Sequence, residues 1–336
     1  MQKLADKYAS HRLIAEALKN KGYKIKHHKT KAAIVSLVSP QGVTWGNSEG
    51  AIVYPFNSKS IVEIAHDKIL TYKVARAANF STPYTLAVTD EISDSQLQDV
   101  LNTYKEVVVK PADRALSIGL TLHVQSLVAL KRAIEYAKEF SASVLIQQQV
   151  TGEEIRFTIL EGKVIAALLR RTARVIGDGV SLVTELIKQE NKERERLQFE
   201  YLSYPQLTDS LIDSQFFIND EVPARGSVVE LSHSTMIKGG CSVYDILSDI
   251  HHTYVSAVER FANKLGAGFV VVDVFCSAYG EPATPANHWL IELNTAPVLK
   301  MYYACRGGQQ FDIVSHLIDM IDCRLHGKTL DGKSQL

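Results

Sequence analysis

Two apolar segments in the C-terminal half of the chain carry residues that suit cation binding. Asp273 lies in Gly268-Phe-Val-Val-Val-Asp-Val-Phe, and Glu292 and Asn294 lie in Trp289-Leu-Ile-Glu-Leu-Asn. Runs so rich in Val, Ile, Leu and Phe predict buried strands. Side chains two residues apart on a strand share a face, and a hairpin would bring Asp273 opposite the other two.

This predicted hairpin has two interpretations. Carboxylate and amide oxygens at this density suit Mg²⁺, with Mn²⁺ as an alternative, because Mg²⁺ keeps several waters and is completed by substrate phosphates. The same residues would also suit an edge hairpin with solvated acids. The residues alone leave both interpretations open.

Two lysines further upstream could bind phosphate. Lys68 follows Asp67 on a predicted helix, and Lys110 ends the strand Glu106-Val-Val-Val-Lys-Pro, which runs into a polar loop at 112–119. An ammonium at the edge of a loop rich in backbone N–H groups suits a polyphosphate. Lys68 also fits an ordinary exposed helix lysine, whereas a buried strand would not normally choose a lysine at position 110.

Basic residues gather in two further places. Arg170, Arg171 and Arg174 precede Gly177-Asp178-Gly179, and could bind a phosphate or carboxylate bidentately or form a solvated rim. Lys238-Gly239-Gly240 can bring backbone N–H groups to an anion. The charged run 190–196 is interpreted as a solvated helix end.

Strand and helix patterns alternate along the chain. Helical spacing of apolar residues predicts helices at 11–20, 60–77, 127–140, 182–197, 209–220, 250–265 and 311–325. Apolar runs bounded by turn residues predict strands at 23–29, 32–38, 51–56, 84–88, 106–110, 144–150, 155–160, 164–169, 227–231, 268–275 and 289–294. The pattern predicts an α/β (α+β) protein.

Composition limits the possible partners. The 336 residues predict two or three subdomains, and 37 Lys+Arg balance 37 Asp+Glu, so charge gives no argument for nucleic acid or an anionic membrane. Four widely spaced cysteines favour reduced thiols over zinc or disulfides. No apolar run approaches the ~20 residues of a membrane span, and no signal peptide is evident, so we expect a soluble cytoplasmic protein. A homodimer is favoured only because such dimers are common.

The ordered set of motifs resembles the ATP-grasp superfamily of carboxylate–amine ligases, in particular the ATP-grasp domains of cyanophycin synthetase and of the fused bifunctional glutathione synthetase. The resemblance covers residues 66–325 and is weaker before them. It implies an ATP-grasp fold with a small N-terminal α/β domain at 1–88, which includes the first phosphate-lysine helix, and two α+β subdomains that clamp ATP. These are a small lid subdomain at 89–160 and a C-terminal subdomain at 161–336, with the Mg²⁺ and substrate side.

The resemblance also implies roles for individual residues. The nucleotide-binding residues would be the two phosphate lysines, the phosphate loop, the adenine hinge and the ribose carboxylate: Lys68, Lys110, Ser117, Gly119, Gln147, Gln148, Val150 and Glu154. The implied metal ligands are Asp273, Glu292 and Asn294. The implied catalytic residues are Arg156, Arg170 and Lys110.

Two features depart from the family pattern. Gln147 stands where the hinge usually begins with glutamate, although its amide oxygen can still accept from the adenine amino group. Near Leu231 the family has a substrate-side arginine, and this chain keeps only the Gly239-Gly240 pair that follows it. Arg225, Arg170 and Lys238 are the candidates to replace that arginine.

We therefore expect a ligase that activates a carboxylate with ATP as an acyl phosphate, joins it to an amine and releases ADP and phosphate. The acid and the amine would be small molecules such as amino acids or peptides, or carrier-bound groups. One alternative is an ATP-dependent kinase that needs no amine, and the other is a non-catalytic nucleotide-binding regulatory protein.

Overall fold

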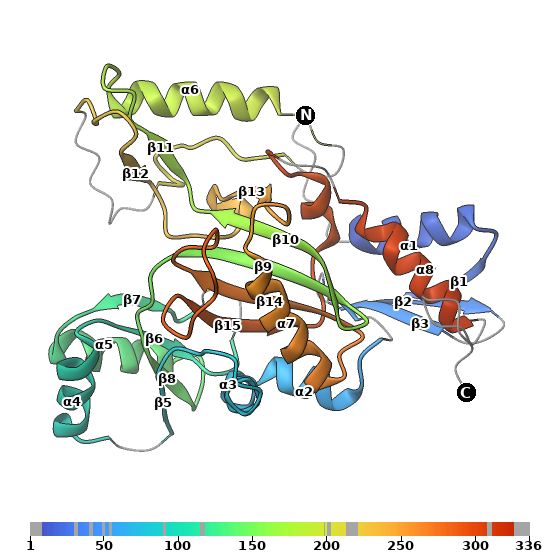
Figure 1. Cartoon of the computed structure of the whole chain (residues 1–336), viewed down its shortest axis with the longest axis horizontal. Coiled ribbons are helices and arrows are strands. Elements are labelled where there is room, and N and C mark those ends of the chain that lie inside the picture. Colours follow the sequence, from blue (N-terminus) through green and yellow to red (C-terminus); the bar gives the residue numbers. More distant parts are fainter. Residues whose placement is uncertain are drawn as a thin grey trace. The chain divides into compact units, whose positions relative to one another are not determined.

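The computed structural model describes residues 9–29, 33–39, 43–48, 51–53, 56–89, 92–114, 118–197, 199, 203–212, 221–307 and 311–325. The chain divides into two compact units, and each is assembled from separated segments (Figure 1). Unit 1 comprises Met1–Pro55, Ala166–Ser248 and Ala296–Leu336, and unit 2 comprises Phe56–Ile165 and Asp249–Thr295.

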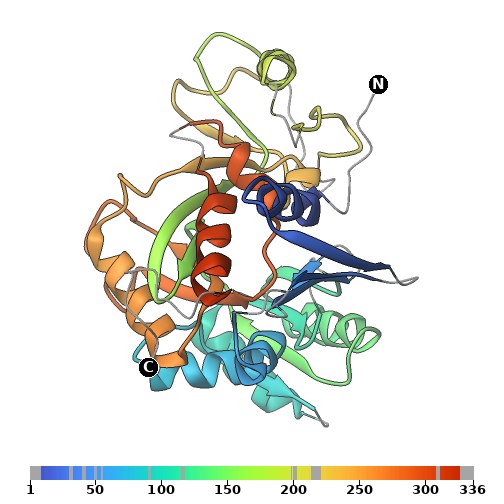
Figure 2. The same cartoon turned by 90° about the vertical axis from the view of Figure 1, so that its right-hand side faces the viewer.

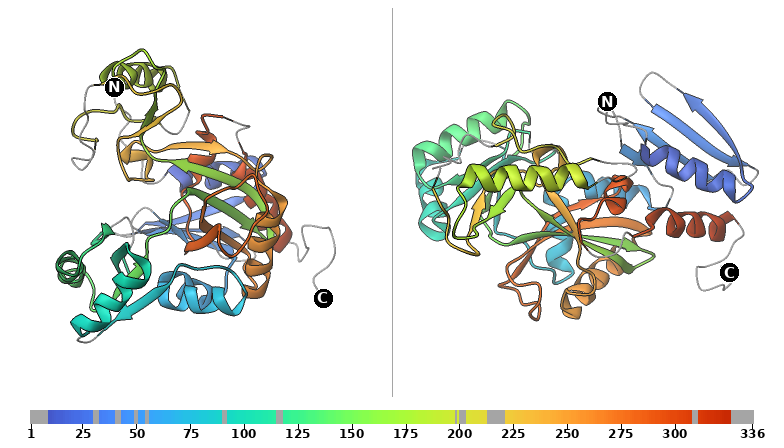
Figure 3. Two further views of the ribbon diagram at one scale, coloured as in Figure 1. Left: turned by 60° about the vertical axis from the view of Figure 1, so that its left-hand side comes forward. Right: turned by 90° about the horizontal axis from the view of Figure 1, so that it is seen from above.

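Unit 1 contains two groups of strands with helices beside them. An antiparallel sheet has the order β1 (Lys24–Lys29), β2 (Ala33–Ser39), β3 (Val43–Ser48), β4 (Ala51–Val53). The helix α1 (Ala9–Asn20) contacts both β1 and the closing helix α8 (Ile313–Leu325), as Figures 2 and 3 show. Lys21 pairs with Asp319 at 2.6 Å beside this contact, so the first and last described segments pack together.

The rest of unit 1 surrounds the strand β10 (Lys163–Arg171), most of which belongs to this unit. β10 pairs with β13 (Ser242–Asp245), and β11 (Arg174–Ile176) pairs with β12 (Val228–Glu230). The other elements are α6 (Val183–Arg196) and two short 3₁₀ helices, η1 (Ile237–Gly239) and η2 (Leu299–Tyr303).

Unit 2 contains a four-stranded antiparallel sheet of order β5 (Thr85–Val88), β8 (Val144–Gln148), β6 (Val107–Pro111), β7 (Thr121–Val124). Alternate residues of these strands, such as Val107 and Val109, face the helices α4 (Asp94–Tyr104) and α5 (Leu127–Lys138). Leu97 and Leu130 are among the helix residues of this core. Both helices therefore cover one face of the sheet.

The second part of unit 2 is built on the antiparallel strands β9 (Glu153–Leu160), β14 (Phe269–Cys276) and β15 (His288–Asn294), in that order. The helices α2 (Lys59–His66) and α3 (Lys68–Ala77) contact β15, and α7 (His252–Leu265) contacts β9. Strand β14 is buried along almost its whole length. The apolar run at 268–275, which predicted a strand, therefore forms the central strand of this part of unit 2.

Most predicted elements are confirmed, with several differences. The helix predicted at 60–77 is two helices, because the backbone of Asp67 is extended between them. The strands β3, β7, β11 and β13 and the helix α4 were not predicted. Residues 209–212 form a turn, and the remainder of the helix predicted at 209–220 lies outside the described residues.

The subdomain boundaries predicted after residues 88 and 160 stay predictions, and both positions lie inside unit 2. β9, just before the second of these positions, pairs with β14. None of the described helices is long and apolar enough to span a membrane.

Candidate active site

The hairpin predicted around Asp273 is present in unit 2. The register of β14 and β15 places Asp273 directly opposite Glu292, next to a bulge that follows Asp273. Asn294 Nδ2 lies 3.3 Å from Asp273 Oδ2 and 3.3 Å from Glu292 Oε2. Three oxygen-bearing side chains therefore converge at one point of the hairpin.

Two basic side chains balance the carboxylates. Arg156 of β9 lies opposite Asp273 in the register, and its Nε and Nη2 atoms donate to the two Asp273 oxygens at 2.8 and 2.7 Å. These side chains are only 11% and 3% exposed. Lys68 Nζ lies 3.7 Å from Glu292 Oε1. The buried, bidentate pair fixes the orientation of Asp273, which makes Arg156 a positioning residue for this carboxylate.

The convergent donors fit a hard divalent cation. Carboxylate and amide oxygens are the ligands that Mg²⁺ and Mn²⁺ prefer, and Glu292 is open enough at 31% exposure to meet an ion. Among the described residues, no group of three or more His, Cys, Asp or Glu side chains could hold a metal. The donor set is thus the two carboxylates with the Asn294 amide.

Lys68 owes its position to the residue before it. Asp67 ends α2, and its Oδ1 accepts from the N–H groups of Ile69 and Leu70 at 2.8 and 3.0 Å, so it is the N-cap of α3. The side chain of Lys68 is 13% exposed, which excludes the exposed-lysine interpretation. Its Nζ donates to the Arg114 carbonyl at 2.5 Å. Burial lowers the pKa of Lys68, and the charge of Glu292 offsets part of this effect.

Replacing Asp67 by Ala should destabilise unit 2 by about 1 kcal/mol, because two N–H groups of α3 lose their acceptor. Asp67→Asn keeps an acceptor oxygen and should lose only part of that amount. Chemical denaturation of both variants measures the difference. Equal stability of Asp67→Ala and the unmodified protein would show that the cap does not hold the first turn of α3.

The second lysine and its loop lie at the end of β6. Lys110 Nζ donates to the Tyr72 hydroxyl at 3.1 Å. Gly119 has a φ of +69°, and a Cβ there would lie 2.7 Å from Phe140 and 2.8 Å from Pro111, so only glycine fits this turn. Ser117 lies outside the described residues.

The hinge residues lie at the end of β8. Gln147 is buried, and its Nε2 donates to Thr85 Oγ1 at 2.8 Å. The side chain of Gln147 therefore bonds within the sheet. Gln148 exchanges hydrogen bonds with the backbone of Tyr84, and Val150, two residues after the end of the strand, is buried.

The ribose candidate lies on the same sheet as the metal candidates. Glu154 is buried on β9, two residues before Arg156, so both side chains lie on one face of the strand. Opposite them on β14 are Phe275 and Asp273. This face of the sheet carries Glu154, Arg156, Asp273 and Glu292 together.

Comparison with known proteins finds similar ligases and synthetases. A family model described as the D-ala D-ala ligase C-terminus matches residues 81–180. The glutathione biosynthesis bifunctional protein of Streptococcus agalactiae is 28% identical over 294 residues, which cover 82% of this chain and 38% of that protein. Cyanophycin synthetase of a Nostoc species is 24% identical over 270 residues, which cover 77% of this chain and 29% of that protein.

The crystal structure of a bifunctional glutathione synthetase from Pasteurella multocida matches 93% of this chain and 44% of that chain, with a TM-score of 0.62 and 22% identity. These similarities support the resemblance to the ATP-grasp superfamily. The ATP-grasp fold predicted from the motif order is thereby confirmed. The chain spans less than half the length of these ATP-grasp relatives.

The three arginines that precede the glycine turn at 177–179 lie in unit 1 and are half-buried and held by neighbours. Arg170 Nη2 donates to Thr235 Oγ1 at 2.7 Å. Arg171 lies over the Tyr244 ring, 5.2 Å from its centroid. Arg174 pairs with Glu230 at 3.1 Å. A freely solvated rim does not describe these side chains.

The segment that lacks the ATP-grasp arginine is also in unit 1. Leu231 is fully buried in an apolar cluster with Ala173 and Val175, and its N–H donates to the Ala173 carbonyl at 2.8 Å. An arginine would not fit that cluster. Of the candidates to replace it, Arg170 contacts this segment through Thr235, whereas Arg225 contacts the Asp178 carbonyl.

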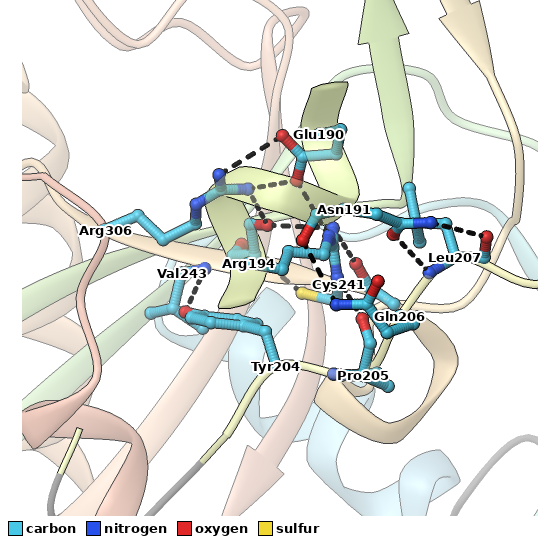
Figure 4. Close-up of polar contacts among 12 residues, drawn as sticks. Glu190, Asn191, Arg194, Tyr204, Pro205, Gln206, Leu207, Cys241, Val243 and Arg306 are labelled. Atoms are coloured by element: carbon cyan, nitrogen blue, oxygen red, sulfur yellow. Dashed lines mark hydrogen bonds and ion pairs between the residues drawn. The ribbon is translucent and has the colours of Figure 1, made fainter. Parts of the chain in front are cut away.

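The prediction that the charged run 190–196 is a solvated helix end is wrong for one of its residues, which belongs to a buried charged network in unit 1. Arg194, in the run interpreted as solvated, is only 3% exposed. Figure 4 shows its polar contacts. It pairs with Glu190 at 2.8 Å, and Arg306 binds the same carboxylate at 2.5 Å. Both guanidiniums lie by the Tyr204 ring, with centroid distances of 5.7 and 5.8 Å.

This network fixes the backbone at the glycine pair, because Arg194 Nη2 donates to the Gly240 carbonyl at 2.8 Å. Glu190 and Arg194 are four residues apart in the sequence, which is the spacing of a helical ion pair. The spacing therefore predicts the ion pair. It does not predict that the pair is buried, because the partners Arg306 and Gly240 come from segments distant in the sequence.

Proposed function

We propose that this ATP-grasp protein is an ATP-dependent carboxylate–amine ligase that forms an amide bond and releases ADP and phosphate. The observation that carries the proposal is the cluster in unit 2 where Lys68 lies 3.7 Å from Glu292 and Asn294 bridges Glu292 and Asp273. It offers charge and oxygen ligands rather than a nucleophile. That composition suits phosphoryl transfer, in which the protein mainly positions groups and neutralises charge.

Each side chain has a defined role in the proposal. Lys68 and Lys110 bind the ATP phosphates, with the turn at Gly119 closing the loop beside them. Gln147, Gln148 and Val150 hold adenine, and Glu154 accepts from the ribose hydroxyls. Asp273, Glu292 and Asn294 hold Mg²⁺ or Mn²⁺, which would neutralise phosphate charge when bound.

The reaction has two steps. A carboxylate oxygen of the acid attacks the γ-phosphorus of ATP, the bond to the bridging oxygen breaks, and ADP leaves. The amine nitrogen then attacks the acyl carbon, inorganic phosphate leaves, and the amine proton passes to solvent. Arg170 stabilises the negative charge of the transferred phosphoryl group, and Arg156 keeps Asp273 in place.

The substrates that we propose are small: an amino acid or short peptide as the acid, and an amino acid, peptide or carrier-bound amine as the acceptor. The balance of 37 basic and 37 acidic residues supports no nucleic acid or membrane partner. The free cysteines fit a reducing cytoplasm. A homodimer is the proposed assembly, because such dimers are the commonest oligomers.

A screen of phosphate release over single and paired amino acids, with ATP and Mg²⁺, tests the proposal. We expect ADP to form only when an acid and an amine are both present. ADP formation without an amine would instead identify a kinase. Nucleotide binding with no ADP release across the panel would favour a regulatory protein.

A further inference from the structure

We propose that Tyr72 is a positioning residue that holds the ammonium group of Lys110 in place and ties it to the strand that carries Glu292. The inference rests on the proposed function, in which Lys110 binds ATP phosphate. No motif in the sequence singles out Tyr72, since a tyrosine at helical spacing is typical of an ordinary core residue. Its contacts distinguish it.

The phenol group of Tyr72 joins three elements of unit 2. Tyr72 lies on α3, one turn after Lys68, so both side chains leave the same face of the helix. Its hydroxyl accepts from Lys110 Nζ of β6 at 3.1 Å and donates to the Ile291 carbonyl of β15 at 2.8 Å. The residue is only 1% exposed.

The hydroxyl uses both its donor and its acceptor capacity in these bonds. The hydroxyl donates its proton in the hydrogen bond to the Ile291 carbonyl, and a lone pair of the hydroxyl oxygen accepts from the Lys110 ammonium. The Lys110 ammonium lies 3.1 Å from the hydroxyl oxygen and 5.7 Å from the ring centre, so it lies beyond the hydroxyl end of the ring and not over its face. The hydroxyl group, and not the ring, therefore holds Lys110.

Such an anchor has a clear use for phosphate binding. A lysine has a flexible four-carbon side chain, and fixing it costs rotamer entropy. Tyr72 reduces the freedom of Lys110 before the nucleotide arrives. Ile291 directly precedes Glu292. The same hydroxyl therefore links Lys110, through hydrogen bonds, to the strand that carries the proposed metal ligand Glu292.

Tyr72→Phe tests the role, because it keeps the ring and removes only the hydroxyl. Tyr254→Phe is a matched control: Tyr254 is also 1% exposed, lies in unit 2, and donates its hydroxyl proton to the Ala278 carbonyl at 3.0 Å. We expect both variants to lose similar stability. Calorimetric titration should show that only Tyr72→Phe binds ATP about tenfold more weakly, whereas both variants bind adenosine, which lacks phosphates, as the unmodified protein does.

A double variant separates positioning from packing. If Tyr72 acts through the lysine, Tyr72→Phe should cause no further loss of ATP affinity in a Lys110→Met background. Equal ATP affinities of Tyr72→Phe and Tyr254→Phe would overturn the role of Tyr72 while leaving the proposed function intact. An additive loss in the double variant would overturn it as well. An unmodified protein that binds no ATP would refute both proposals.

Discussion

Replacing Glu292 by Gln should lower ATP-dependent phosphate release by at least about 100-fold while leaving the fold intact. Glu292 supplies a partly exposed carboxylate that faces Asp273 across the hairpin and lies 3.7 Å from Lys68. The amide of glutamine has nearly the same shape but no charge. The variant therefore loses the strongest accessible ligand of the proposed metal site.

Glu259→Gln is a matched control for this variant. Glu259 is 22% exposed, pairs with Lys163 at 3.6 Å and accepts from the Val164 N–H, so its local environment resembles that of Glu292. It lies on α7 and plays no part in the proposed site. Phosphate release should be almost unchanged in Glu259→Gln. Normal release by Glu292→Gln would show that the metal assignment is wrong.

Replacing Arg156 by Met should destabilise the protein by about 3–5 kcal/mol, because it leaves the buried carboxylate of Asp273 without its partner. Phosphate release should also fall, because Asp273 loses the two guanidinium hydrogen bonds that orient it. Arg156→Lys keeps the charge but cannot form two parallel hydrogen bonds. We expect that variant to regain part of the stability and still release phosphate at least about tenfold more slowly.

Chemical denaturation and the phosphate-release assay together measure these effects. Arg76→Met is a suitable control, because Arg76 is exposed and its guanidinium donates to Thr82 Oγ1 at 3.2 Å. It should change stability by less than about 0.5 kcal/mol. If Arg156→Met were as stable and as active as this control, the ion pair would not be needed to position Asp273.

The hairpin that carries Asp273, Glu292 and Asn294 could be predicted because each of its strands is an apolar run that carries a hard oxygen ligand. Period-two geometry then fixes which side chains share a face. The break between α2 and α3 could not be predicted from periodicity, because the apolar pattern continues through residues 60–77. Only the cap made by Asp67 shows where one helix ends and the next begins.

Burial of polar groups was the hardest feature to predict. The charged run at 190–196 has the composition of a solvated surface, yet Arg194 is enclosed by Glu190, the Tyr204 ring and the Gly240 carbonyl. Because these partners lie far from Arg194 in the sequence, the residues around Arg194 show no pattern that would predict its burial. For the same reason the contact between Lys110 and Tyr72 has no signature in either segment, and the pairing of β9 with β14 crosses the predicted domain boundaries.

The proposed ligase activates the carboxylate of its acid substrate as an acyl phosphate. Transfer of oxygen isotope tests it most directly, with the acid found by the screen labelled with ¹⁸O in its carboxylate. We expect one labelled oxygen to appear in the inorganic phosphate and ADP to be the nucleotide product. Unlabelled phosphate, or AMP as the product, would contradict it.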